Sequence, residues 1–154
     1  MNLEAPADDG ALLAAFETAA LPAEAWNHRA HVRLAYVYAI RHDLNTAVHR
    51  MRAGLYALNH AHRVPDDVNR GYHETITVAF MRLIHAKCRH QTFTSSAEFC
   101  DRNPELMQKD VLLEYYSRGR LRCPEAKTAF AEPDLKPLPD ELMLVAQCEQ
   151  PRAM

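Results

Sequence analysis

Two short histidine-containing stretches hold the residues of this chain that are best suited to chemistry. The first runs from Trp26 to His31 and the second from Gly71 to Thr77. His28 and His31 are three positions apart, so on a helix their side chains share one face, with Cβ atoms roughly 5–6 Å apart. Two neutral imidazoles at that separation can converge on one divalent metal ion.

The second stretch adds a third imidazole, His73, and an adjacent carboxylate, Glu74. Both stretches are expected at helix starts, so helices that bring these ends together would collect His28, His31, His73 and, as an optional fourth ligand, Glu74. Such a set suits Zn, Fe(II), Ni or Mn, and an open coordination position would make the centre catalytic. The HExxH pattern of zinc proteases is absent, because position 77 is threonine.

A metal at this centre would activate water or polarise a substrate oxygen, which predicts a metal-dependent enzyme acting on a small molecule. Hydrolysis, isomerisation and oxygenation are all compatible with the pattern. Glu74 is the expected general base if it is not a ligand, and Tyr72 is a second candidate catalytic group. The candidate substrate-binding residues are Trp26, Thr77, Arg118 and Arg120.

Two other interpretations fit the same residues. In the first, a metal-free pocket lined by histidine, glutamate and tyrosine recognises a small molecule through hydrogen bonds. In the second, the side chains have a structural role, with His73 bonded to a backbone carbonyl and Glu74 stabilising a helix N-terminus. Arg118 and Arg120 would then be cations near a helix C-terminus that Gly119 ends.

The elements that must position these residues are predicted to be helical. Glycine is rare, long stretches are rich in Ala, Leu, Met, Glu and Arg, and no run alternates in the manner of a strand. Helices are expected near 8–20, from an Asn27 cap to about Arg41, from Asn45 or Thr46 to about Asn59, from about Tyr72 to Lys87, after Ser95 or Ser96, and from Pro104 to about Tyr116, with a short turn opening at Pro124.

The expected fold class is therefore all-α, a single-domain helical bundle of about five to six helices. Residues 7–131 form the predicted helical core. Three prolines lie between 133 and 139, which excludes a helix interior there. Residues 132–154 are accordingly predicted to be an extended, proline-rich C-terminal arm.

Composition narrows the classes of partner. The chain has 154 residues, a net charge of −2, 48% hydrophobic and 25% charged residues, which is typical of a globular domain. No basic patch favours nucleic acid, and neither a membrane span nor a secretion signal is apparent. Four widely spaced cysteines favour the reducing cytoplasm. A small molecule is the expected partner, and a homodimer is left open.

The two histidine strings belong to a longer recognisable pattern. Together with Tyr116-Ser117-Arg118 and Glu132-Pro133-Asp134-Leu135, they resemble a family of small uncharacterised bacterial all-α proteins with WxHxAH and GYHETIT motifs. The resemblance spans about residues 15–139 and implies a shared helical fold with both strings in one site, but no activity. A looser likeness to DinB-type metal-binding helical bundles is architectural only, because their HxxxH spacing is absent.

Overall fold

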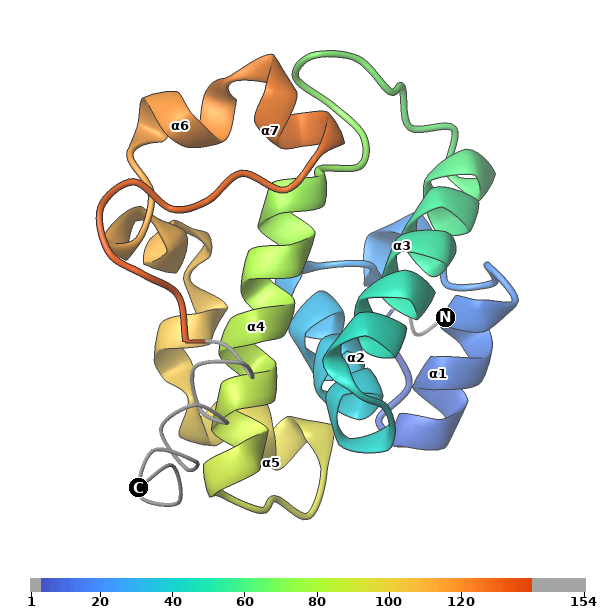
Figure 1. Ribbon diagram of the computed structural model, residues 1–154. Coiled ribbons are helices and arrows are strands. Elements are labelled where there is room, and N and C mark those ends of the chain that lie inside the picture. The colour runs from blue at the N-terminus through green and yellow to red at the C-terminus, as the bar shows by residue number, and fades with distance from the viewer. Residues whose placement is uncertain (1–3, 140–154) are drawn as a thin grey trace.

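Every regular element among residues 4–139, the part of the chain that the computed structural model describes, is helical (Figure 1). This confirms the all-α class. An isolated bridge between Asp67 and Arg70 is the only strand-like pairing in these residues. The α-helices are α1 (Asp9–Glu17), α2 (His28–Arg41), α3 (Leu44–Ala61), α4 (Glu74–His90), α5 (Ser96–Arg102), α6 (Arg118–Arg122) and α7 (Pro124–Thr128), and the 3-10 helices are η1 (Ala23–Ala25), η2 (Pro104–Met107) and η3 (Lys109–Glu114).

Short polar side chains cap α2, α3 and α5, and the caps of α2 and α5 are among the residues that the sequence predicts. Asn27 caps α2, since its Oδ1 accepts a hydrogen bond from the Ala30 amide at 2.9 Å. Ser95 caps α5 in the same way. The third helix begins slightly earlier than expected, because Asp43 is its cap. The start of α4 lies later than expected, since His73 precedes the helix as its cap.

The expected helix from Pro104 to about Tyr116 is wrong. The segment forms η2 and η3, separated by Gln108 in an extended conformation with φ −96° and ψ 120°. The expectation that Gly119 ends a helix is also wrong. Ser117 Oγ accepts a hydrogen bond from the Arg120 amide at 3.1 Å, so a new helix, α6, starts there and contains Gly119.

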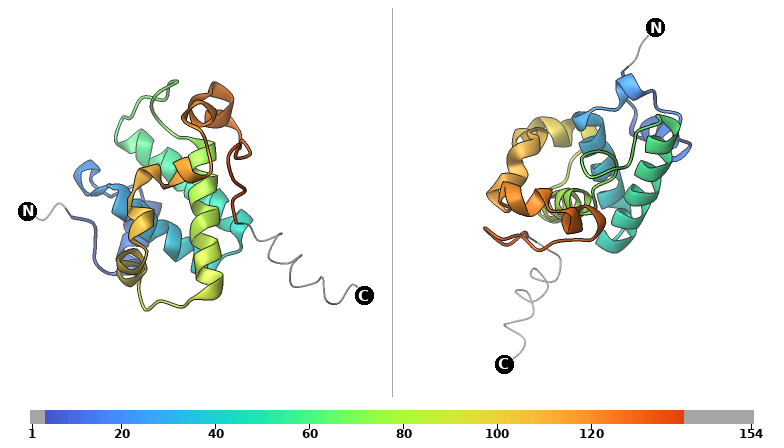
Figure 2. Two further views of the ribbon diagram at one scale, coloured as in Figure 1. Left: turned by 90° about the vertical axis from the view of Figure 1, so that its left-hand side faces the viewer. Right: turned by 90° about the horizontal axis from the view of Figure 1, so that it is seen from above.

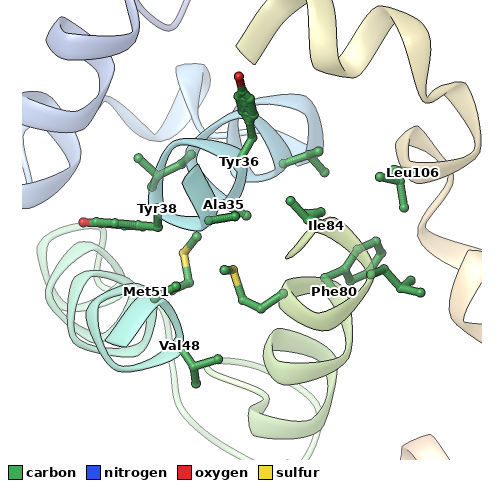
Figure 3. Close-up of a cluster of buried hydrophobic side chains, with 14 of the residues drawn as sticks. Ala35, Tyr36, Tyr38, Val48, Met51, Phe80, Ile84 and Leu106 are labelled. Atoms are coloured by element: carbon green, nitrogen blue, oxygen red, sulfur yellow. The ribbon is translucent and has the colours of Figure 1, made fainter. Parts of the chain in front are cut away.

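The hydrophobic core is built around α2, which packs against α1, α3, α4 and α5. Buried side chains occur on nearly every face of α2, as expected for a helix enclosed by others. Figure 3 shows Ala35 and Tyr38 of α2 in one cluster with Met51 of α3 and Ile84 of α4. Burying one large aliphatic side chain contributes roughly 1.5–3 kcal/mol, so this cluster fixes the relative positions of the helices.

The chain after α7 folds back over the helices without forming one. The Leu135 amide donates to the Tyr115 carbonyl at 2.9 Å, and both the amide and the hydroxyl of Ser117 bond to Asp134. Leu138 is buried. The predicted extended arm is therefore seen as far as residue 139, and its part from 140 to 154 lies outside the described residues. Viewed from above, α6 and α7 lie beside the loop that leads into α4 (Figure 2).

A glycine in α3 permits a close approach between two helices. A Cβ atom on Gly54 would lie 2.0 Å from Cε2 of the buried Phe16. Gly54→Ala should therefore lower the free energy of unfolding by about 1–2 kcal/mol, although alanine is intrinsically the better helix former. Gly119→Ala is the matched control, since a Cβ there meets nothing within 4 Å. Urea unfolding of both variants checks this, and a Gly54→Ala protein as stable as wild type would contradict it.

Candidate functional site

A cavity of about 350 Å³ lies where the N-terminal ends of α2 and α4 meet. His28, His31 and His73 all line it, so the structure brings the two predicted stretches together. Trp26, Thr77 and Tyr72, three other predicted site residues, also belong to its wall. The remaining lining is mainly apolar and comes from α2, α3, α4, η3 and α6; it includes Leu55, Ile76, Phe80, Leu112 and Leu121.

His73 has both ring nitrogens engaged with the backbone. Its Nδ1 accepts a hydrogen bond from the Ile76 amide at 3.1 Å, which caps α4. Its Nε2 donates to the Leu121 carbonyl at 3.0 Å and so joins α4 to α6. Burial lowers the pKa of this histidine, in agreement with a neutral ring that accepts at one nitrogen and donates at the other. In this arrangement the ring has no lone pair left for a metal.

His28 is fixed in the cavity wall by one backbone contact and one ring contact. Its Nε2 donates to the Leu106 carbonyl in η2 at 2.8 Å. The ring lies edge-on to Phe80 of α4, with centroids 5.3 Å apart. Since a carbonyl can only accept, Nε2 carries the hydrogen, and Nδ1 is the nitrogen that this contact leaves available.

His31 differs from the other two because its ring makes no hydrogen bond within residues 4–139. It stacks on Trp26, with ring centroids 5.3 Å apart and an interplanar angle of 25°. Burial lowers its pKa to about 4, with smaller contributions from His28 and Lys109. His31 is therefore neutral near pH 7, with one donor and one acceptor available at the cavity.

Glu74 does not line the cavity and is held by an arginine of α3. Arg52 donates to both carboxylate oxygens, at 2.9 and 2.6 Å, and the Tyr72 hydroxyl donates to Oε1 at 2.6 Å. The hydrogen bond from Arg52 lowers the pKa of Glu74. Burial, and then the bond to Glu74, raises the pKa of Tyr72. Catalytic roles for Glu74 and Tyr72 stay predictions, and this geometry gives both a positioning role between α3 and α4.

The two arginines predicted to contact substrate also lie away from the cavity wall. Arg120 donates from Nε to the Glu132 carbonyl at 2.9 Å, so it holds the C-terminal arm. Arg118 is exposed at the start of α6. The neighbouring residue that does reach the cavity is Leu121. Sequence reasoning missed Lys109, which lines the cavity from η3; it belongs to no motif, and its position depends on the unpredicted break at Gln108.

The donor atoms do not fit a resident metal as they are arranged. Within residues 4–139, no three or more His, Cys, Asp or Glu side chains are grouped so that they could hold one ion. His73 has both nitrogens bonded, and Glu74 is bound by Arg52. His28 and His31 remain, whereas protein zinc sites use three or four protein ligands. The metal centre therefore stays a prediction.

Comparisons with known proteins identify no relative. No protein-family model, curated protein or solved structure matches the chain. In the part of the chain that the structure describes, no helix combines the length and apolar character needed to cross a bilayer. The cavity is therefore the feature from which a function can be inferred.

The buried imidazole of His31 makes stability depend on pH. The folded state resists protonation down to a pKa of about 4, while the unfolded chain titrates near 6.5, so the unfolded state binds more protons below pH 6.5. This contribution to stability is complete above pH 6.5 and is lost as the pH falls, by roughly 1–2 kcal/mol at about pH 5. His31→Gln should reduce that loss, whereas His90→Gln, at an exposed position, should not. Urea unfolding of the wild type and of both variants, above pH 6.5 and at about pH 5, measures these losses of stability. Equal losses in all three proteins would contradict the expectation.

Proposed function

We propose that this chain binds a small organic molecule, without a resident metal, in the cavity lined by His28, His31 and His73. This space is hereafter called the histidine cavity. The observation that carries the proposal is the cavity between α2 and α4, whose wall combines three aromatic side chains, Trp26, Tyr72 and Phe80, with a few polar groups. Its volume of about 350 Å³ is at the lower end of the range of small-molecule pockets. Mostly apolar walls with few polar groups are typical of such pockets.

The hydrogen bonds of the histidines support binding over metal coordination. His28 and His73 are fixed by backbone carbonyls from η2 and α6, which sets the walls before any ligand arrives. His31 retains a free donor and a free acceptor, so it is the polar group most available for recognition. A preformed wall reduces the entropy lost on binding, which favours affinity for a small ligand.

The experiment compares binding before and after the cavity is filled. Ala35 lines the cavity and is buried, so Ala35→Leu should occupy part of the space, whereas Ala53→Leu alters an exposed position on α3. Saturation-transfer NMR with 2-naphthoate, 2-naphthamide and 2-naphthylmethylamine is run in EDTA. Binding of at least one probe, weakened in Ala35→Leu alone, supports the proposal. Binding of none, or equal binding in both variants, overturns it.

A metal-dependent enzyme is the second candidate. Two observations favour this candidate. His28 and His31 both line the cavity, and three of their four ring nitrogens have no hydrogen-bond partner in the described residues. A metal there would need further ligands from substrate or water. Elemental analysis of protein purified without added metal tests this: stoichiometric metal that is lost in both His28→Ala and His31→Ala would favour the enzyme.

A further inference from the structure

The charge distribution around the histidine cavity favours one class of ligand. Among its lining residues, Lys109 is the sole charged side chain, and no aspartate or glutamate contributes to the wall. Lys109 also forms no ion pair with any residue in the range 4–139. The nearby carboxylate of Glu74 is neutralised by Arg52, at 2.6 Å. A cation without a partner at the mouth of an apolar cavity favours a ligand of opposite charge.

The helices strengthen this field. The first turns of the 14-residue α2 and the 17-residue α4 belong to the cavity wall, since His28 begins α2 and His73 caps α4, and the wall continues along both helices to Ala35 and Ile84. The N-terminal end of each helix carries a partial positive charge of about half a unit. The partial charges at these two helix ends and the charge of Lys109 are therefore all positive. The available N–H of His31 adds a hydrogen-bond donor on the same wall.

The shape of the wall constrains the rest of the ligand. Trp26 and His31 are stacked nearly parallel, and Phe80 presents its ring beside His28 at 5.3 Å. Leu112 adds an aliphatic surface from η3, the helix that begins with Lys109. A flat apolar body would contact these rings, while a charged end would reach the lysine.

We infer that the ligand is a small carboxylic acid with a planar apolar body, its carboxylate bound by Lys109 and His31 and its body held among Trp26, Phe80 and Leu112. The inference rests on the proposed function, because it requires the cavity to bind a small molecule. A hydrogen bond between a lysine ammonium and a carboxylate is stronger than the equivalent contact to a neutral group.

Titration calorimetry with 2-naphthoate and its neutral isostere 2-naphthamide tests the ligand class. Wild-type protein should bind the acid about tenfold more tightly than the amide, equivalent to about 1.4 kcal/mol. Lys109→Gln should reduce that preference by weakening only the acid, since the helix N-termini and the His31 N–H remain. Lys136→Gln is the matched control, because it removes the same charge from the C-terminal arm, where Lys136 lies near Glu114. Lys109 is exposed, so its variant should fold, which circular dichroism verifies.

Each result has a distinct meaning. An acid preference that Lys109→Gln reduces and Lys136→Gln retains supports the inference. If both probes bind equally well, or if the amide binds better, the carboxylate assignment is overturned while the proposed pocket stands. An acid preference unaffected by Lys109→Gln also overturns it. If neither probe binds, the assignment fails, and the proposed function fails with it only when 2-naphthylmethylamine does not bind either.

Discussion

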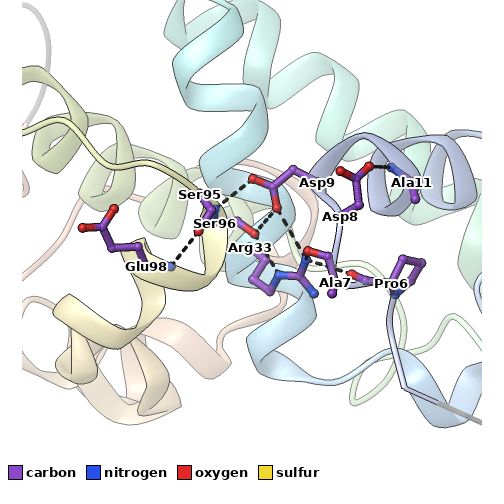
Figure 4. A network of polar contacts seen from close by, with 9 residues as sticks. All are labelled: Pro6, Ala7, Asp8, Asp9, Ala11, Arg33, Ser95, Ser96 and Glu98. Atoms are coloured by element: carbon purple, nitrogen blue, oxygen red, sulfur yellow. Dashed lines mark hydrogen bonds and ion pairs between the residues drawn. The ribbon is translucent and has the colours of Figure 1, made fainter.

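Replacing Arg33 by methionine is expected to lower the free energy of unfolding by roughly 3 kcal/mol, because it breaks a buried charged network. Arg33 is only 7% exposed. Its Nε donates to Ser96 Oγ at 2.8 Å, and its terminal nitrogen donates to the carbonyls of Pro6 and Ala7 and lies 3.5 Å from Asp9 (Figure 4). The Ser96 amide and hydroxyl both donate to Asp9, so the network joins α1 and the segment before it to α2 and α5.

Urea unfolding followed by the fluorescence of Trp26, the single tryptophan, measures this change. Arg29→Met is the matched control on the same helix. Arg29 pairs with Asp101 at 3.2 Å, but both side chains are largely exposed, so we expect a change below about 0.5 kcal/mol. A loss of less than about 1 kcal/mol in Arg33→Met would show that the network contributes little to stability.

Phe16→Ala is expected to have the largest effect on stability, a loss of about 4 kcal/mol. The ring is fully buried, stacks on Trp26 at 5.5 Å and meets Tyr38 edge-on at 6.2 Å. Gly54 lies so close that a Cβ there would clash with the ring. Such tight packing leaves a cavity on truncation that its neighbours cannot readily fill.

The same variant connects the core to the candidate site. Phe16 supports Trp26, and Trp26 stacks on His31 in the cavity wall. Phe16→Ala should therefore also weaken the binding of 2-naphthoate, measured by calorimetry under conditions where the protein remains folded. Leu135→Ala provides the control for both measurements, because that side chain is 59% exposed. Near-wild-type stability in Phe16→Ala would contradict the packing argument.

The sequence predicted the long helices well, because their signals are local. Asn27 and Ser95 are short polar side chains at the right positions to cap α2 and α5, and each does so through an amide three residues on. The region after Pro104 was not predictable in the same way. The helical conformation is interrupted at Gln108, because the side chains of Leu106 and Leu112 on either side of it are both buried in the core.

The sequence predicted only part of the cavity wall, since Glu74, Arg118 and Arg120 lie outside it, and it did not predict the contacts. The shared cavity of His28, His31 and His73 follows from two helix starts that meet, and the spacing within each stretch indicates those starts. What the spacing cannot supply is the partner of each group. Arg52 lies 22 positions before Glu74, and no local pattern links them. The carbonyl of Leu121 is likewise 48 positions from His73.

The proposed ligand pocket requires that backbone carbonyls hold the imidazoles of His28 and His73 in its wall, so that His73 is not a metal ligand. Long-range ¹H–¹⁵N NMR of the histidine rings during a zinc titration tests this, with His73→Asn used to assign the signals of residue 73. We expect a neutral His73 protonated at Nε2, whose ring signals stay unchanged at one equivalent of zinc. Saturable shifts of His28, His31 and His73 together at that stoichiometry would contradict the proposed pocket and establish a metal centre.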